Sequence, residues 1–264
     1  MILAIMMPIL LFAQQNTERY GACMMRDSTT IGIHENERFA MHSVMKFPQA
    51  LYVAYYLNRK GIELSETIVV NRSDLMQDTW SPMLKTIERE KVFTYSELLE
   101  LSLAQSDNNA CDLLFKHCGG PRAVEKYMRK LGFNDIHIRK TEKQLHRKPS
   151  DAIRNNCTPI EMANLFKWFF NHKNDNKYLR FIWDSMANCS TGQKRIPAVL
   201  PEGATVVHKT GTGFPSPEGT QDMNDAGIII MPDGNQSYIA IFTTNTRAEE
   251  ELANLARQLL FGER

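Results

Sequence analysis

Hydrophobic positions follow a strand-like pattern near both ends of the chain. Five short apolar runs bounded by turn residues predict strands, at 20–25, 29–33, 205–210, 226–231 and 238–244. The turn Arg26-Asp27-Ser28 joins the first two runs as a hairpin. The last segment, 249–260, has leucines at helical spacing, which predicts an amphipathic helix that closes the chain.

The middle of the chain has helical periodicity instead. Helices are predicted from residue 43 to a stop at Gly61 and in four further segments, 96–104, 109–118, 121–131 and 159–170. Strands at both termini with helices between them predict an α/β fold of the α+β type, with an antiparallel sheet flanked by helices. The sheet subdomain would comprise 16–42 plus 187–264, and an all-helical subdomain, 43–186, would be inserted in it. Inside the insertion, 140–156 is polar and aperiodic, which predicts a long loop.

Composition narrows the classes of function. With 264 residues, 43% of them hydrophobic, the chain can form a substantial core, and its net charge of +1 gives no basic field for nucleic acid. Small-molecule chemistry is therefore favoured, and we expect a monomer. The five cysteines are odd in number and scattered, which favours buried free thiols over disulfides or zinc. The seven histidines form no ligand-spaced cluster, so neither a metal nor another cofactor is expected.

The first residues form an apolar run of signal-peptide length. Residues 1–15 are too short to span a bilayer, so export to the periplasm or outside the cell is expected, with no stable membrane span. The run lacks a preceding Lys or Arg, which suggests that the true start lies upstream. The alternative is an apolar first helix packed on the sheet.

The sequence Ser43-Val44-Met45-Lys46 carries the first candidate chemistry. In a helix, residues three apart share a face, so the Ser43 hydroxyl and the Lys46 amine can meet. A desolvated lysine can take the proton of a serine, and a helix N-terminus can stabilise an oxyanion. By itself the tetrapeptide is a weak signal, because such a serine is more often a helix cap and such a lysine a solvated side chain.

Two further motifs follow along the chain. Ser106-Asp107-Asn108 lies between two predicted helices, where alone it would be read as a loop and a helix cap. Lys209-Thr210-Gly211 ends a predicted strand, and Gly211 and Gly213 leave room for a ligand along its edge.

Together and in this order, the three motifs resemble the Ser-x-x-Lys, Ser-Asp-Asn and Lys-Thr-Gly set of class A β-lactamases and penicillin-binding proteins. The resemblance extends from about Tyr20 to the terminal helix and includes 79–82 and 191–196. It is strongest to the extended-spectrum, cephalosporin-hydrolysing branch of class A. A small-molecule β-lactam is therefore the expected substrate.

The resemblance also implies roles for individual residues. Ser43 would be the nucleophile, Lys46 or Glu142 its base, and the backbone N–H groups of Ser43 and Thr212 the oxyanion hole. Ser106 would relay a proton under the influence of Lys209. The implied substrate-binding residues are Trp80, Asn108, His146, Arg195, Thr210, Gly211, Thr212 and Gly213. For Trp80 the alternative is a core side chain, and for Arg195 it is a helix-surface or capping role.

Glu142 separates the possible activities. It lies sixteen residues before Thr158, where the family's omega loop carries the glutamate that activates the deacylating water. A D,D-peptidase or penicillin-binding transpeptidase, or a β-lactam sensor that stays acylated, would not need it, and both stay open as alternatives. A β-lactamase that hydrolyses penicillins and cephalosporins is the favoured reading.

The loop departs from the family pattern at two places. The usual Asn four residues after the glutamate is replaced by His146, which leaves the second ligand of the water open and could add a pH dependence. The Arg–Asp pair that often joins the loop ends is replaced by Lys140 and Asn155, which cannot form a full ion pair. We therefore expect a differently held or roomier loop.

Overall fold

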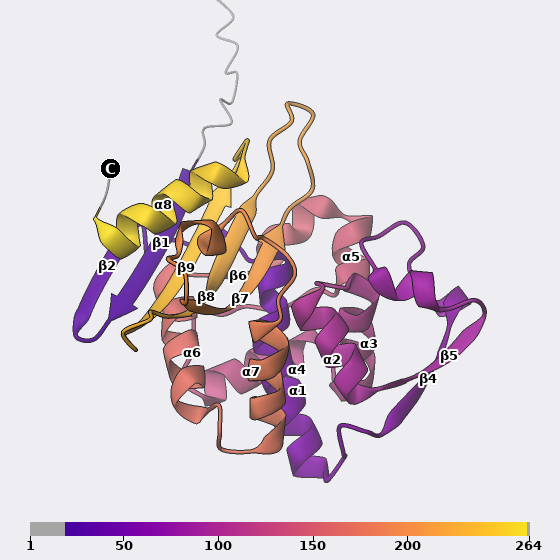
Figure 1. The fold of residues 1–264 in the computed structure, drawn as a ribbon. Coiled ribbons are helices and arrows are strands. Elements are labelled where there is room, and N and C mark those ends of the chain that lie inside the picture. The colour runs from indigo at the N-terminus through magenta and orange to yellow at the C-terminus, as the bar shows by residue number, and fades with distance from the viewer. Residues whose placement is uncertain (1–18, 263–264) are drawn as a thin grey trace, which may run out of the picture.

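The computed structural model describes residues 19–262. Its main sheet has five antiparallel strands in the order β2-β1-β9-β8-β7 (Figure 1). These strands are β1 (Arg19–Arg26), β2 (Thr29–Ile33), β7 (Thr205–Thr212), β8 (Met223–Ile230) and β9 (Gln236–Thr244). The predicted sheet built from both termini is confirmed, and so is the α+β fold.

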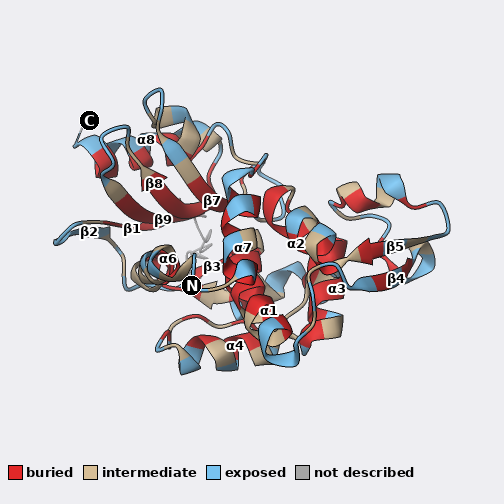
Figure 2. Ribbon diagram, turned by 60° about the horizontal axis from the view of Figure 1, so that its bottom comes forward, coloured by how far each residue is buried: buried red, intermediate tan, exposed pale blue. Residues whose placement is uncertain are grey.

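Helices cover both faces of this sheet. The terminal helix α8 (Glu249–Phe261) lies across one face, where its leucines pack on alternate strand residues such as Ala22 and Ile239. The other face meets α6 (Pro159–His172) and the main core, which contains Cys23 and Phe242. Figure 2 shows the central strands buried along most of their length. Because alternate side chains point to opposite faces, one set of strands serves two cores.

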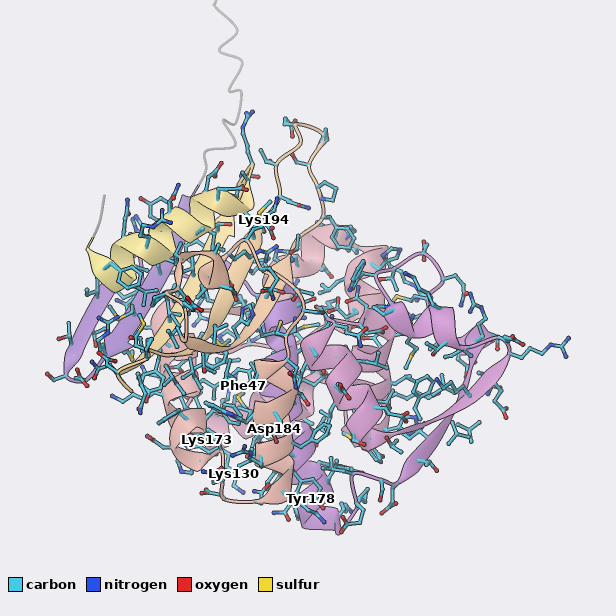
Figure 3. All side chains as sticks on the ribbon, viewed as in Figure 1. Phe47, Lys130, Lys173, Tyr178, Asp184 and Lys194 are labelled. Atoms are coloured by element: carbon cyan, nitrogen blue, oxygen red, sulfur yellow. The ribbon has the colours of Figure 1, made fainter. Side chains whose placement is uncertain are left out.

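The inserted region is built around α1 (Lys46–Lys60). It also contains α2 (Tyr95–Ala104), α3 (Asn108–Cys118), α4 (Pro121–Lys130) and α7 (Lys177–Ala187). Phe47 of α1 is fully buried and stacks on Phe166 of α6 with ring centroids 4.1 Å apart, among the side chains that fill the centre of the molecule (Figure 3). α1 ends at Gly61, which has a left-handed φ of 68°, as the sequence predicts.

Two expectations about the inserted region are corrected. It is not entirely helical, because β4 (Thr67–Asn71) and β5 (Glu90–Thr94) form a separate antiparallel pair, and β3 (Phe39–Ala40) pairs with β6 (Asn156–Cys157). The expected loop 140–156 contains a short helix, α5 (Glu142–Arg147), and a 3-10 turn (Pro149–Arg154). A capping box between Thr141 and Gln144 starts α5.

Other expectations concern the cysteines and the N-terminus. All five cysteines are free and buried, as expected. The apolar run 1–15 lies outside the described residues. Among the helices of 19–262, none is long and apolar enough to cross a membrane.

Candidate active site

Ser43 and Lys46 meet as the sequence predicts. Ser43 lies in a 3-10 turn (His42–Met45) that runs directly into α1. Lys46 is fully buried, and its Nζ donates to Ser43 Oγ at 3.0 Å and to the backbone oxygen of Ser106 at 2.7 Å. The same Nζ donates to Asn108 Oδ1 at 2.6 Å. The interpretation of Lys46 as a solvated surface side chain is therefore wrong.

The Ser-Asp-Asn motif connects α2 to α3, and its three residues have different roles. Asp107 caps α3 by accepting from the backbone N–H of Ala110 at 2.9 Å, and it also accepts from Ser81 Oγ at 2.9 Å. Ser106 has a left-handed φ of 58°, and its hydroxyl lies 2.9 Å from Lys209 Nζ. The capping interpretation is thus correct for the middle residue, while its two neighbours face the site.

Lys209 reaches the site from β7 and is fully buried. Burial and, to a smaller extent, the positive charge of Lys46 together lower the pKa of Lys209 to about 7. Gly211, two residues on, has no room for a side chain, because a Cβ there would lie 2.5 Å from the backbone oxygen of Met41. This close approach brings the strand edge against the segment that carries Ser43.

Glu142 enters the site from the first turn of α5. Its Oε1 lies 3.2 Å from Lys46 Nζ. The helix start is fixed by Asp112 of α3, which accepts from the backbone N–H of Glu142 at 2.7 Å and of Lys143 at 2.8 Å. Burial raises the pKa of Asp112 to about 6, and the nearby Glu142 charge acts in the same direction. Asp112 was not singled out in the sequence, although it lies one helical turn after Asn108 on the same face of α3.

Lys140 and Asn155 hold the ends of this segment by separate contacts. Lys140 Nζ pairs with Asp151 at 2.8 Å. Asn155 is fully buried, and its Oδ1 accepts from the backbone N–H groups of Arg139 and Lys140 at 2.8 and 2.9 Å. Its Nδ2 donates to the backbone oxygen of Lys140 at 2.9 Å. A neutral amide therefore joins the two ends through main-chain groups.

Aromatic and imidazole side chains surround the mouth of the site. Trp80 is 62% exposed and donates its indole N–H to the backbone oxygen of Gln105 at 2.9 Å, so the alternative of a core tryptophan is wrong. His146 Nε2 lies 3.1 Å from Asp78 Oδ2, and its ring lies 6.0 Å from that of Phe214.

Arg195 is buried against the end of β7, so a helix-surface position is wrong. Its Nε pairs with Glu249 Oε1 at 2.7 Å, and its Nη2 donates to Thr212 Oγ1 at 2.7 Å. Its Nη1 donates to the backbone oxygen of Gly211 at 3.0 Å. The neighbouring Thr210 shares a hydrogen bond of 2.6 Å with Thr191, so both threonines are fixed by partners outside the strand.

These side chains enclose one cleft of about 480 Å³. The predicted residues that line it are Ser43, Trp80, Ser106, Asn108, Glu142, His146, Arg195, Thr210, Thr212 and Gly213. Lys46 and Lys209 lie directly behind this wall. The cleft also includes residues that sequence reasoning missed, among them His42, Thr191, Gly192 and Glu249. His42 had a local signal because it directly precedes Ser43, and Thr191 and Gly192 had one because they lie in the stretch 191–196 that carries part of the resemblance.

A buried lysine between a serine hydroxyl and a carboxylate, beside a second lysine–serine pair, is an arrangement suited to nucleophilic catalysis by serine. The chain belongs to the β-lactamase enzyme family, whose model matches residues 9–260. It is a class A β-lactamase, a hydrolase, and the resemblance seen in the sequence is confirmed.

Three relatives illustrate the similarity. β-Lactamase VEB-1 of Pseudomonas aeruginosa is 32% identical over 229 residues, which cover 86% of this chain and 77% of VEB-1. The crystal structure of TLA-3 extended-spectrum β-lactamase superposes with a TM-score of 0.88 at 29% identity, covering 92% of each chain. A class A β-lactamase from Bacteroides cellulosilyticus gives a TM-score of 0.85 at 28% identity, covering 95% of this chain and 94% of the other.

Proposed function

We propose that this enzyme hydrolyses the amide bond of penicillins and cephalosporins through an acyl-enzyme on Ser43, which water activated by Glu142 then hydrolyses. The observation that carries the proposal is the position of Lys46 Nζ, 3.0 Å from Ser43 Oγ and 3.2 Å from Glu142 Oε1. One buried amine thus contacts both the nucleophile and the carboxylate needed for the second step. The similarity to an extended-spectrum enzyme supports cephalosporins among the substrates.

Acylation begins when Ser43 Oγ loses its proton and attacks the lactam carbonyl carbon. Either Lys46 in its neutral form or Glu142 through a water would accept this proton, since Lys46 Nζ contacts both Ser43 Oγ and Glu142 Oε1. The resulting oxyanion would lie between the backbone N–H groups of Ser43 and Thr212. Preorganised donors of this kind contribute about 3–4 kcal/mol each to transition-state stabilisation.

Collapse of the tetrahedral intermediate breaks the lactam C–N bond, and the departing nitrogen needs a proton. Ser106 is placed to donate it, because its hydroxyl contacts Lys209 Nζ at 2.9 Å and lies 3.4 Å from Lys46 Nζ. With its pKa lowered to about 7, Lys209 can return a proton to Ser106 near neutral pH.

Deacylation would use Glu142 as general base. A water between Glu142 and the ester carbonyl would lose its proton to the carboxylate and attack the carbon. The C–O bond to Ser43 would then break as the proton returns to Ser43 Oγ by way of Lys46, which contacts both groups. Asp112 positions this base by binding the first two N–H groups of α5. His146 lies one helical turn after Glu142 and would provide the second contact of this water. Its Nε2 pairs with Asp78, which fixes the orientation of the ring.

Substrate binding would involve the strand edge and the mouth of the cleft. The substrate carboxylate would contact Thr210 and Thr212, with Lys209 and Arg195 supplying positive charge from behind. The guanidinium of Arg195 already serves Glu249 and Thr212, so its main task is to orient that hydroxyl.

The opposite side of the cleft would bind the rest of the substrate. Asn108 would hold the side-chain amide of the substrate, while Trp80 would flank the entrance. The expectation that Gly211 and Gly213 leave room for a ligand is wrong. A Cβ on Gly211 would lie 2.5 Å from the backbone oxygen of Met41, and a Cβ on Gly213 would lie 2.9 Å from His42 Cε1, so both glycines let the end of β7 pack closely against the segment that carries Ser43.

Turnover of a chromogenic cephalosporin by the purified protein tests the proposal. Many turnovers per enzyme molecule are expected. One equivalent of acylation without release would instead indicate a sensor, and release of D-alanine from stem peptides would favour a D,D-peptidase.

Intact-mass measurement then separates the two steps. Glu142→Gln should accumulate an adduct on Ser43, whereas Ser43→Ala should form none. Rapid acylation of Glu142→Gln would assign the first proton transfer to Lys46, and slow acylation would assign it to Glu142.

We further propose that the protein acts as an exported monomer in the periplasm or outside the cell. Sequencing the N-terminus of exported protein would test this, since a start within about residues 13–20 is expected for cleavage after the apolar run. Light scattering would test the monomer.

A further inference from the structure

His42, directly before Ser43, has an unusual backbone conformation. Its φ is 48°, in the left-handed region that residues other than glycine rarely adopt, and its side chain is buried. Such a conformation persists only where surrounding contacts hold it. The contact here is a hydrogen bond of 2.8 Å from Nε2 to Asp222 Oδ2, at a side chain that the proposed reaction does not use.

Asp222 is itself fixed to the opposite wall of the site. Its backbone oxygen accepts from the N–H of Gly213 at 2.8 Å, and its Oδ1 accepts from the N–H of Asn245 at 3.3 Å. Gly213 directly follows Thr212. The carboxylate that holds His42 is therefore attached to the strand end that carries the second oxyanion donor.

The two segments pack without space between them. A Cβ on Gly213 would lie 2.9 Å from His42 Cε1, so the imidazole lies against the glycine backbone. A second hydrogen bond joins the segment before Ser43 to the sheet: Asn224 Nδ2 of β8 donates to the backbone oxygen of Ala40 at 2.8 Å. Ser43 belongs to the first of these two segments and Thr212 to the second.

We propose that the His42–Asp222 pair is a positioning pair that sets the separation of the Ser43 and Thr212 N–H groups. This inference rests on the proposed function, because it assumes that these two groups bind the oxyanion. His42 holds the first donor through the chain, and Asp222 holds the second through Gly213. Neither side chain touches the reacting atoms.

The size of the effect follows from the geometry of oxyanion holes. A displacement of about 1 Å in a catalytic group costs about 100-fold in rate, and full removal of one donor costs about 100- to 1000-fold. The Asn224 tie remains when the pair is broken, so the donors should shift without being lost. We expect a fall of about 10- to 100-fold in kcat, with a much smaller change in KM.

The test compares Asp222→Ala, which removes the acceptor, with Asp222→Asn, which keeps an oxygen for the His42 N–H. The control is His34→Asn. His34 also has a left-handed φ, 47°, and pairs with Glu37 at 3.0 Å, but both side chains are exposed and neither lines the cleft. Asparagine tolerates that φ, so the control removes the pair without adding backbone strain.

Three quantities are measured for each protein: kcat and KM for a chromogenic cephalosporin, the affinity for a boronic acid that forms a tetrahedral adduct on Ser43, and Tm. Asp222→Ala should lose kcat and boronic-acid affinity by a similar factor, Asp222→Asn should recover most of both, and His34→Asn should match the wild type. A purely structural role would lower Tm in Asp222→Ala without this parallel loss.

The outcomes distinguish a failure of the positioning role of the His42–Asp222 pair from a failure of the proposed function. Asp222→Ala within about twofold of the wild type in kcat and boronic-acid affinity overturns the pair's role, while wild-type turnover still supports the proposed function. Failure of Asp222→Asn to recover either quantity also overturns it, because the proposed tie needs only an acceptor. Absence of turnover by the wild type overturns the proposed function, and the pair's role falls with it.

Discussion

Replacing Asn155 with alanine should destabilise the segment that carries Glu142. The Asn155 amide is fully buried and serves three main-chain groups, the N–H groups of Arg139 and Lys140 and the carbonyl of Lys140. Glu142 lies two residues after Lys140. Alanine would leave all three groups without their partner and would free the start of α5 from one of its two anchors, since Asp112 would remain.

The expected magnitude follows from these three groups. A buried polar group left unsatisfied costs about 1–3 kcal/mol. Arg139 is exposed and Lys140 is half-buried, so water can reach part of the gap and the lower end applies to each of the three groups. The expected loss is about 3 kcal/mol in the free energy of unfolding. At about 2–4 °C per kcal/mol for a chain of this size, Tm should fall by about 6–12 °C.

Thermal unfolding of Asn155→Ala beside Asn156→Ala tests this reasoning. Asn156 is the adjacent amide, and its side chain makes only exposed hydrogen bonds, to Ile153 and Arg38, so its loss should cost under about 1 kcal/mol. Asn155→Ala should also prolong the life of the acyl-enzyme in intact-mass spectra, because Glu142 is less firmly placed. Equal Tm values for the two variants would refute the argument.

Three further predictions concern buried groups behind the cleft. Burial lowers the pKa of His208, but Asp225 at 2.8 Å outweighs it and raises the value from 6.5 to about 10. The pair's stabilisation should therefore be complete below pH 6.5 and lost as pH rises toward 10. The difference in unfolding free energy between wild type and Asp225→Asn, from denaturant titrations, should shrink across that window, and a constant difference would contradict the assignment. Burial raises the pKa of Cys189, but His208 reverses this and lowers it to about 7, whereas burial raises the pKa of Cys118 to about 12. Iodoacetamide at neutral pH should thus label Cys189 first in peptide maps, and equal labelling would argue against a polarised thiol. Arg195→Ala should cost about 2–4 kcal/mol of stability, because it leaves the two buried carbonyls of Gly211 and Asn224 without their donor and removes the partner of the partly exposed Glu249, and Arg195→Lys should restore only part of the lost Tm.

The main sheet and most helices could be predicted from sequence because each has a face that must be buried. β1, β8 and β9 are buried on both faces and carry runs of apolar residues, and the helices repeat their apolar residues at helical spacing. β4 and β5 gave no such signal. They are short, pair only with each other and expose Val69 and Val92. Their pairing depends on a contact across about twenty residues, which local periodicity does not contain.

The short helix α5 was missed for a different reason. The sequence has its signal, a capping box in which Thr141 and Gln144 satisfy each other's backbone N–H groups. The surrounding charged residues hide any apolar stripe, and only Leu145 is buried. For so short a helix, the cap was the better guide than periodicity.

The candidate site divides in a similar way. Motif residues could be predicted because their chemistry depends on local spacing, as with Ser43 and Lys46. Asp112, Asp222 and Glu249 bind partners that lie 30, 180 and 54 residues away in the sequence: a backbone N–H group, an imidazole and a guanidinium. Nothing in the sequence around them indicates those partners.

The hydrogen bonds of Lys46 link this division to the mechanism. An ammonium has three protons to donate, yet its Nζ lies within 3.2 Å of four oxygens, on Ser43, Ser106, Asn108 and Glu142. The shortest contacts, to the Ser106 carbonyl and to Asn108 Oδ1, hold two protons on groups that cannot readily be protonated. The third N–H can point either to Ser43 Oγ or to the Glu142 carboxylate, but only the carboxylate can take its proton. That transfer would leave a neutral amine whose lone pair can accept the proton of Ser43. Two motifs that the sequence places sixty residues apart thus leave the lysine one exchangeable proton, in contact with both the nucleophile and the proposed hydrolytic base.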